Sequence, residues 1–90
     1  MQATDTPRHS SQATHEMVGE EALVINLNSG SYYELNDTGA RFWQLIDGQR
    51  TITDCARIIA ADYEEVDIAE VEADLLELAA QFQAEGLIVI

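Results

Sequence analysis

Two strand-like runs joined by a short turn restrict the folds open to this chain. Residues 21–27 (EALVINL) are rich in β-branched residues and leucine, and residues 32–35 (YYEL) contain two tyrosines. Residues 28–31 (NSGS), which lie between them, are typical of turns because Gly30 can adopt a positive φ. A weaker run precedes this pair, between about residue 14 and Val18. The order predicts a meander of three antiparallel strands.

Side chains alternate between the two faces of a strand, so each run carries two sets of residues. In the second run, we expect Tyr33 and Leu35 to face the core and Tyr32 and Glu34 to face away from it. In the first run, one face carries Leu23, Ile25 and Leu27.

Three helical segments follow the strands. Asn36 is a good N-cap for a first helix that continues to about Ile46, and a second helix is expected to begin near Thr53. Asp67 caps a third helix, which Gly86 stops. The apolar residues of this third helix recur at intervals of three and four: Ile68, Val71, Leu75, Leu78 and Phe82. The chain is therefore expected to be an α+β domain, with a three-stranded antiparallel sheet followed by three helices.

The two ends of the sequence differ from its middle. Residues 1–13 are polar and carry few apolar side chains, so we expect a disordered tail there and a folded domain over residues 14–90. Residues 87–90 (LIVI) are entirely apolar and must be paired, buried or bound to something.

Charge excludes several classes of partner. The chain has 17 acidic residues, four arginines, no lysine and a formal net charge of −13. Nucleic acids and anionic membrane surfaces both attract clustered positive charge, so neither is an expected partner. The sequence also lacks an apolar run of about 18 residues and the apolar core of a signal peptide. We expect a cytoplasmic protein.

The sequence contains no catalytic constellation. Cys55 has no histidine near it in sequence and is expected to be a core residue. His9 and His15 lack the partners of a zinc site. A solvated face is the expected role of the acidic residues Glu64, Glu65, Glu70, Asp74 and Glu77. We therefore expect a binding protein without a metal ion or cofactor.

The most informative candidate site is the third strand beside the third helix. An edge strand presents unpaired N–H and C=O groups, and an extended peptide can add to it as a further strand. The apolar stripe of the helix would form the wall of the groove, although the same side chains could instead belong to the core. The candidate peptide-binding residues are Ser31, Tyr32, Tyr33, Glu34, Leu35, Val71, Asp74, Leu75, Leu78 and Phe82.

Several segments together resemble the PqqD family, the small peptide chaperones of pyrroloquinoline quinone biosynthesis and the related recognition domains of ribosomally made, modified peptides. They are LNSGSYYELN (residues 27–36), TGARFW (38–43), LIDG (45–48), TI (51–52) and EGL (85–87). The resemblance implies a winged-helix-like fold and no catalysis. It also implies that the leader segment of a precursor peptide binds as an added strand against residues 31–35, beside the helix over residues 67–85.

The resemblance further implies that the leader is delivered to a separate modifying enzyme, such as a radical SAM protein, a cyclase or a protease. It leaves the precursor and the pathway open. Two other classes remain: an acidic winged-helix regulatory subunit, and an assembly subunit that dimerises through residues 87–90 or the open strand edge. A winged-helix regulator that binds DNA is disfavoured because residues 67–85 contain acidic side chains and no basic one.

Overall fold

The structure is a computed structural model that describes residues 1–90. Its elements in chain order are β1 (Arg8–His9), β2 (Ala13–Val18), β3 (Glu21–Asn26), β4 (Tyr32–Leu35), α1 (Asp37–Leu45), α2 (Ile52–Ala60), α3 (Ile68–Ala84) and β5 (Ile88–Val89). The predicted α+β order of three antiparallel strands followed by three helices is confirmed. None of the three helices has the length and apolarity that crossing a bilayer requires.

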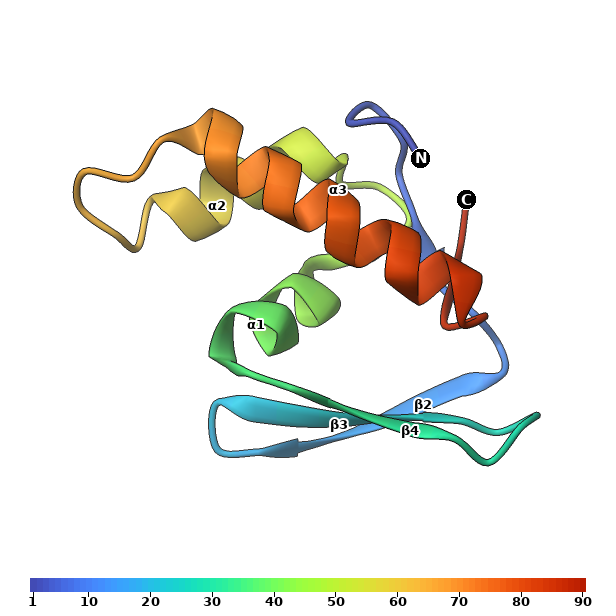
Figure 1. Ribbon diagram of the computed structural model, residues 1–90. Helices are drawn as coiled ribbons and strands as arrows, with labels where there is room; N and C mark the ends of the chain where they lie inside the picture. Colours follow the sequence, from blue (N-terminus) through green and yellow to red (C-terminus); the bar gives the residue numbers. More distant parts are fainter.

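The main sheet has the strand order β2-β3-β4, and both pairings are antiparallel. The three helices lie on the same side of this sheet (Figure 1). On that inner side, Ala22, Val24 and Leu35 are buried, and Tyr33 is half-buried against the core. The predicted inward direction of Tyr33 and Leu35 is therefore confirmed. Leu23, Ile25 and Leu27 alternate with the buried residues of β3 and face away from the helices.

Side-chain caps fix where the helices begin. Asn36 accepts a hydrogen bond from the backbone N–H of Gly39 at 2.9 Å, as expected of the cap of α1. The second helix, expected to begin near Thr53, begins one residue earlier, at Ile52. Thr51 is the cap, because its hydroxyl and the Asp54 carboxylate each accept the other residue's backbone N–H at 3.0 Å. Asp67 caps α3 as predicted.

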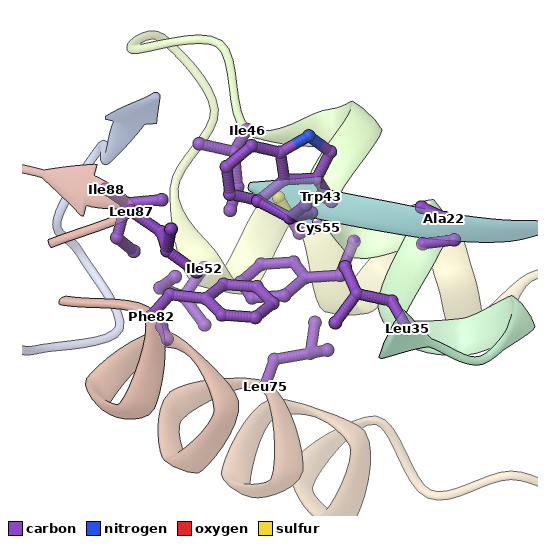
Figure 2. Packing of buried hydrophobic residues seen from close by; sticks show 14 of the residues in the cluster. Ala22, Leu35, Trp43, Ile46, Ile52, Cys55, Leu75, Phe82, Leu87 and Ile88 are labelled. Carbon is purple, nitrogen blue, oxygen red and sulfur yellow. The ribbon is translucent and has the colours of Figure 1, made fainter. Parts of the chain in front are cut away.

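One apolar core fills the space between the sheet and the helices. Figure 2 shows Leu75 and Phe82 pointing from α3 into the same cluster as Leu35 and Trp43. The rings of Phe82 and Trp43 meet edge to face, with centroids 5.6 Å apart. The predicted core position of Cys55 is confirmed, since its side chain is fully buried in this cluster. Each large side chain buried here contributes about 1.5–3 kcal/mol to folding.

Residues 1–13 differ from the expected disordered tail. β1 pairs antiparallel with β5, and Pro7 is among the fully buried side chains. The imidazole of His9 stacks on the indole of Trp43 with centroids 3.9 Å apart, and His9 Nε2 lies 2.8 Å from the Trp43 carbonyl oxygen. A few backbone bonds and one stacked ring hold this polar segment, so its composition gives little sign of order.

The same pairing accounts for the apolar residues 87–90. Leu87 and Ile88 are buried in the core, and β5 takes β1 as its partner. Of the three possibilities for this segment, pairing and burial are both realised, although Ile90 stays exposed.

Candidate functional site

β4 is an edge strand with one free side. It pairs with β3 alone, and no other segment of the chain lies in a ladder with its second side. The backbone N–H of Asn26 donates to the Ser31 carbonyl at 2.8 Å. Hydrogen-bonded pairs alternate along an antiparallel ladder, so the backbones of Tyr33 and Leu35 also bond to β3. The N–H and C=O groups of Tyr32 and Glu34 consequently point to the open side.

A hollow of ≈ 390 Å³ lies between the end of β4, the start of α1 and the middle of α3. The sequence predicted five of the side chains that line it, and three further residues come from the start of α1. Its lining residues are Glu34, Leu35, Asn36, Thr38, Gly39, Asp74, Leu75 and Leu78. The structure therefore brings the strand edge and the third helix to one hollow, which is the arrangement that the predicted groove requires.

The predicted site residues divide by burial. Leu75 is 2% exposed, Phe82 4% and Leu35 7%, so these three belong mainly to the core. Leu35 and Leu75 still reach the floor of the hollow, whereas Phe82 does not line it. Leu78 is half-buried and Asp74 exposed at its wall.

The other predicted site residues lie around the hollow rather than in it. Ser31 is exposed in the turn before β4, and Tyr32, the first residue of β4, is 66% exposed. Tyr33 and Val71 are half-buried and pack against the core.

Glu85 joins the end of α3 to the strands. The Tyr33 hydroxyl donates to Glu85 Oε2 at 2.6 Å, and Asn26 Nδ2 donates to the Glu85 carbonyl oxygen at 2.8 Å. The hydrogen bond to Glu85 is also the main reason that the pKa of the Tyr33 hydroxyl is raised. Sequence reasoning missed this contact, although Glu85 continues the three-and-four spacing beyond Phe82.

The first turn of α1 was also missed as part of the site. Gly39 is buried there, and an added Cβ would lie 3.3 Å from Asn36 Oδ1 and 3.4 Å from Leu35 Cβ. Both contacts are tighter than usual for a Cβ, so a larger residue at position 39 would require Asn36 or Leu35 to shift by a few tenths of an ångström. The signal was present in the Thr38–Gly39 pair that follows the cap.

Comparison with known proteins settles the family. The sequence model described as "Coenzyme PQQ synthesis protein D (PqqD)" matches residues 21–88, which include β3, β4 and all three helices. The chain belongs to the PqqD family. No curated protein sequence matches it.

Two solved structures are similar to this PqqD-family chain. One is TbiB1 in complex with the TbiA(beta) leader peptide, with 25% sequence identity, a TM-score of 0.82, and coverage of 90% of this chain and 93% of that one. The other is a lasso peptide synthetase B1 complexed with the leader peptide, with 22% identity and a TM-score of 0.82. The second match covers 94% of this chain and 99% of that chain, and it shows a shared fold.

The hollow of this PqqD-family chain is acidic. Asp74 is exposed at its wall, Glu34 lines it from the edge of β4 with its side chain directed to the outer face, and no lining residue carries a positive charge. Two of the four arginines are engaged elsewhere, where Arg41 pairs with Asp62 and Arg50 with Asp47. The field at the hollow therefore favours a cationic ligand.

Cys55 lies in the core, and we expect it to be inert in the native protein. Desolvation by burial raises the pKa of its thiol to about 11, so at pH 8 the reactive thiolate is scarce and shielded. At pH 8, a chromogenic disulfide reagent should label Cys55 at least about a hundredfold more slowly in native protein than in denaturant. Equal rates in native and denatured protein would contradict this placement.

Proposed function

We propose that this PqqD-family chain is a non-catalytic peptide chaperone. It binds the leader segment of a ribosomally made precursor peptide as a strand added to β4 and presents the peptide to a separate modifying enzyme. The open edge of β4 beside the hollow under α3 carries this proposal. Family membership supports it, as do two structures of the same fold that were solved with leader peptides.

In this proposal, the backbone and the side chains have different tasks. The outward N–H and C=O groups of Tyr32 and Glu34 provide up to four hydrogen bonds to an added strand. Every second side chain of that strand points toward the helices, where Leu78 and the floor residue Leu75 offer an apolar contact. The edge sets the direction and register of the peptide, and the hollow selects its side chains.

The remaining predicted residues frame this contact. Ser31 begins the edge, and Tyr33 closes one end through its hydrogen bond to Glu85. Val71 and Phe82 support α3 from within the core, and Leu35 does the same for β4. The contribution of Val71 and Phe82 to peptide affinity is therefore indirect, whereas Leu35 also reaches the floor of the hollow.

The expected affinity follows from these contacts. Four ladder hydrogen bonds contribute about 1 kcal/mol each, and two or three buried peptide side chains about 2 kcal/mol each. Ordering the leader reduces the favourable binding free energy by about 2–5 kcal/mol, and the loss of rigid-body freedom reduces it further. The balance is a dissociation constant in the micromolar range or weaker, which suits a chaperone that must release its cargo.

The test is a titration of a candidate leader peptide into ¹⁵N-labelled protein. The amides of Tyr32 and Glu34 should shift most and gain protection from hydrogen exchange, because they acquire new acceptors. The amides of Tyr33 and Leu35 already bond to β3 and should gain little protection. Shifts confined to the other sheet edge, Ala13–Val18, would contradict strand addition at β4.

Salt should weaken the complex when the leader carries Lys or Arg. Glu34 and Asp74 line the hollow, while Glu70 and Glu77 are exposed on the same helix as Asp74. We expect the dissociation constant to rise about three- to tenfold between 50 and 500 mM NaCl, mainly through a slower association rate.

A matched pair of variants locates the effect. Asp74→Asn should reduce the salt dependence, whereas Glu64→Gln, in the turn between α2 and α3, removes the same charge from a residue that does not line the hollow and should not. An affinity that does not change with salt would contradict the electrostatic contribution and leave the strand addition intact.

A further inference from the structure

The outer face of the main sheet is uncovered. All three helices lie on the inner side (Figure 1). The strand residues that alternate with the buried ones therefore point to the uncovered side. From β2 to β4, these outer residues are Thr14, Glu16, Val18, Glu21, Leu23, Ile25, Tyr32 and Glu34.

Four residues form an apolar stripe on this face. Leu23 and Ile25 follow each other along β3, Leu27 continues their line, and Tyr32 lies opposite Ile25 in the ladder. Leu27 is 60% exposed and Tyr32 66%, and the other two are half-buried. We call these four residues the outer stripe. The fold does not use them as core, and contiguous exposed apolar residues of this kind mark interaction sites.

Acidic residues flank the outer stripe. Leu23 lies between Glu16 on β2 and Glu34 on β4, and Glu21 precedes it on β3. The four arginines lie in β1, α1, α2 and the loop before α2, so none of them is on this face. Two copies that met through this face would bring their acidic flanks together, which disfavours a dimer. The complementary surface is an apolar ridge with Lys or Arg beside it.

The outer face is continuous with the peptide-binding edge. Tyr32 and Glu34 direct their backbone groups to the open edge and their side chains to the outer face. A strand added there alternates as β4 does, so every second peptide side chain extends the outer face. The outer face is therefore wider when the edge is occupied.

We propose that this outer face, extended by the bound leader, is the docking surface for the modifying enzyme. The enzyme contacts the outer stripe through an apolar surface flanked by basic residues and binds the loaded chaperone more tightly than the empty one. This inference rests on the proposed function, because it requires a leader on the edge of β4. By linkage, the enzyme must also tighten leader binding by the same factor.

The experiment measures two affinities with the full chain. The probes are the leader peptide that binds it and the purified enzyme that modifies the corresponding precursor. Saturating leader should lower the dissociation constant of the enzyme at least about fivefold. The double variant Ile25→Thr, Leu27→Ser should weaken enzyme binding at least about tenfold. Leader affinity should stay within about twofold of the wild type.

Matched control variants test whether a loss of enzyme binding is specific to the outer face. Val66→Thr with Ile68→Ser removes two exposed apolar side chains at the turn before α3 and at its start, and should leave both affinities unchanged. Glu16→Lys should weaken enzyme binding by repelling the basic flank, whereas Glu64→Lys should not. Glu16 is on β2, away from the peptide edge, so its substitution keeps the test valid if the stripe variant is unstable.

The outcomes are distinct. Enzyme affinity that is the same for wild type, the stripe variant and Glu16→Lys would overturn the docking surface, as would self-association of the chain that these variants abolish. Enzyme affinity that does not respond to the leader would overturn the preference for the loaded form. Failure of the leader to bind the wild-type chain would instead refute the proposed function.

Discussion

Glu34→Pro is expected to weaken leader binding by about ten- to a hundredfold while the domain stays folded. The N–H of Glu34 points to the open edge, so proline there removes a donor that the folded chain itself does not use. Proline is tolerated on an edge strand when its nitrogen faces solvent. In the complex, a peptide carbonyl loses its partner and meets the pyrrolidine ring, which costs about 1–3 kcal/mol.

Tyr33→Pro provides the contrast one residue earlier. The N–H of Tyr33 bonds to β3, so proline at this position breaks the central hairpin and also removes the phenol that bonds to Glu85. We expect this variant to lose about 3 kcal/mol of stability or more, or to fail to fold. The two variants therefore distinguish the hydrogen bonds of β4 to an added peptide from its hydrogen bonds to β3.

The measurement combines calorimetry of leader binding with thermal unfolding. Glu34→Gln is the control for the lost charge, and it should keep most of the affinity at high salt. If Glu34→Pro binds the leader as tightly as Glu34→Gln does, the peptide does not add to β4 through its backbone.

Local signals in the sequence were sufficient for most of the fold. The starts of α1 and α3 were predictable from Asn36 and Asp67, because a capping side chain bonds to backbone groups only two or three residues away. The start of α2 was predicted one residue too late because Thr51 and Thr53 are both good caps, and the reciprocal hydrogen bonds with Asp54 distinguish Thr51. The burial of Pro7 and the stacking of His9 on Trp43 were not predictable from local signals, because they join residues far apart in sequence.

The site was predictable in outline but not in depth. Periodicity placed Leu75, Leu78 and Phe82 on one stripe of α3, yet it does not tell a wall of the groove from the core beneath it. Burial separates them: Leu75 and Phe82 are inside, while Leu78 remains at the surface of the hollow. The contacts of Glu85 with Asn26 and Tyr33 depend on how α3 meets the sheet, which no local pattern records.

Leu75→Asp is expected to unfold the domain, and this corrects an expectation from the sequence pattern. As a wall of the groove, Leu75 would tolerate a charge and lose only binding. In the structure it is 2% exposed among core residues (Figure 2). Removing such a leucine costs about 2–5 kcal/mol, and a buried carboxylate adds several more. A domain of this size has roughly 5–13 kcal/mol of stability in total.

Leu78→Asp should instead keep the fold and lose the peptide. Leu78 is half-buried, so we expect the free energy of unfolding to fall by only about 1–2 kcal/mol. The leader loses an apolar contact worth about 2 kcal/mol, so its dissociation constant should rise about thirtyfold. Val71→Asp should have a smaller effect on binding, because Val71 packs on the core without lining the hollow.

Leu76→Asp is the matched control for Leu78→Asp. Leu76 is also half-buried on α3 and packs against the core, but it does not line the hollow. Its substitution adds the same charge to the same helix and should cost similar stability with little change in leader affinity. Urea unfolding of all four α3 variants, with leader titration of the three expected to fold (Val71→Asp, Leu76→Asp and Leu78→Asp), tests the assignment. Equal losses of affinity for Leu76→Asp and Leu78→Asp would show that the hollow does not hold the peptide, because only Leu78 reaches it.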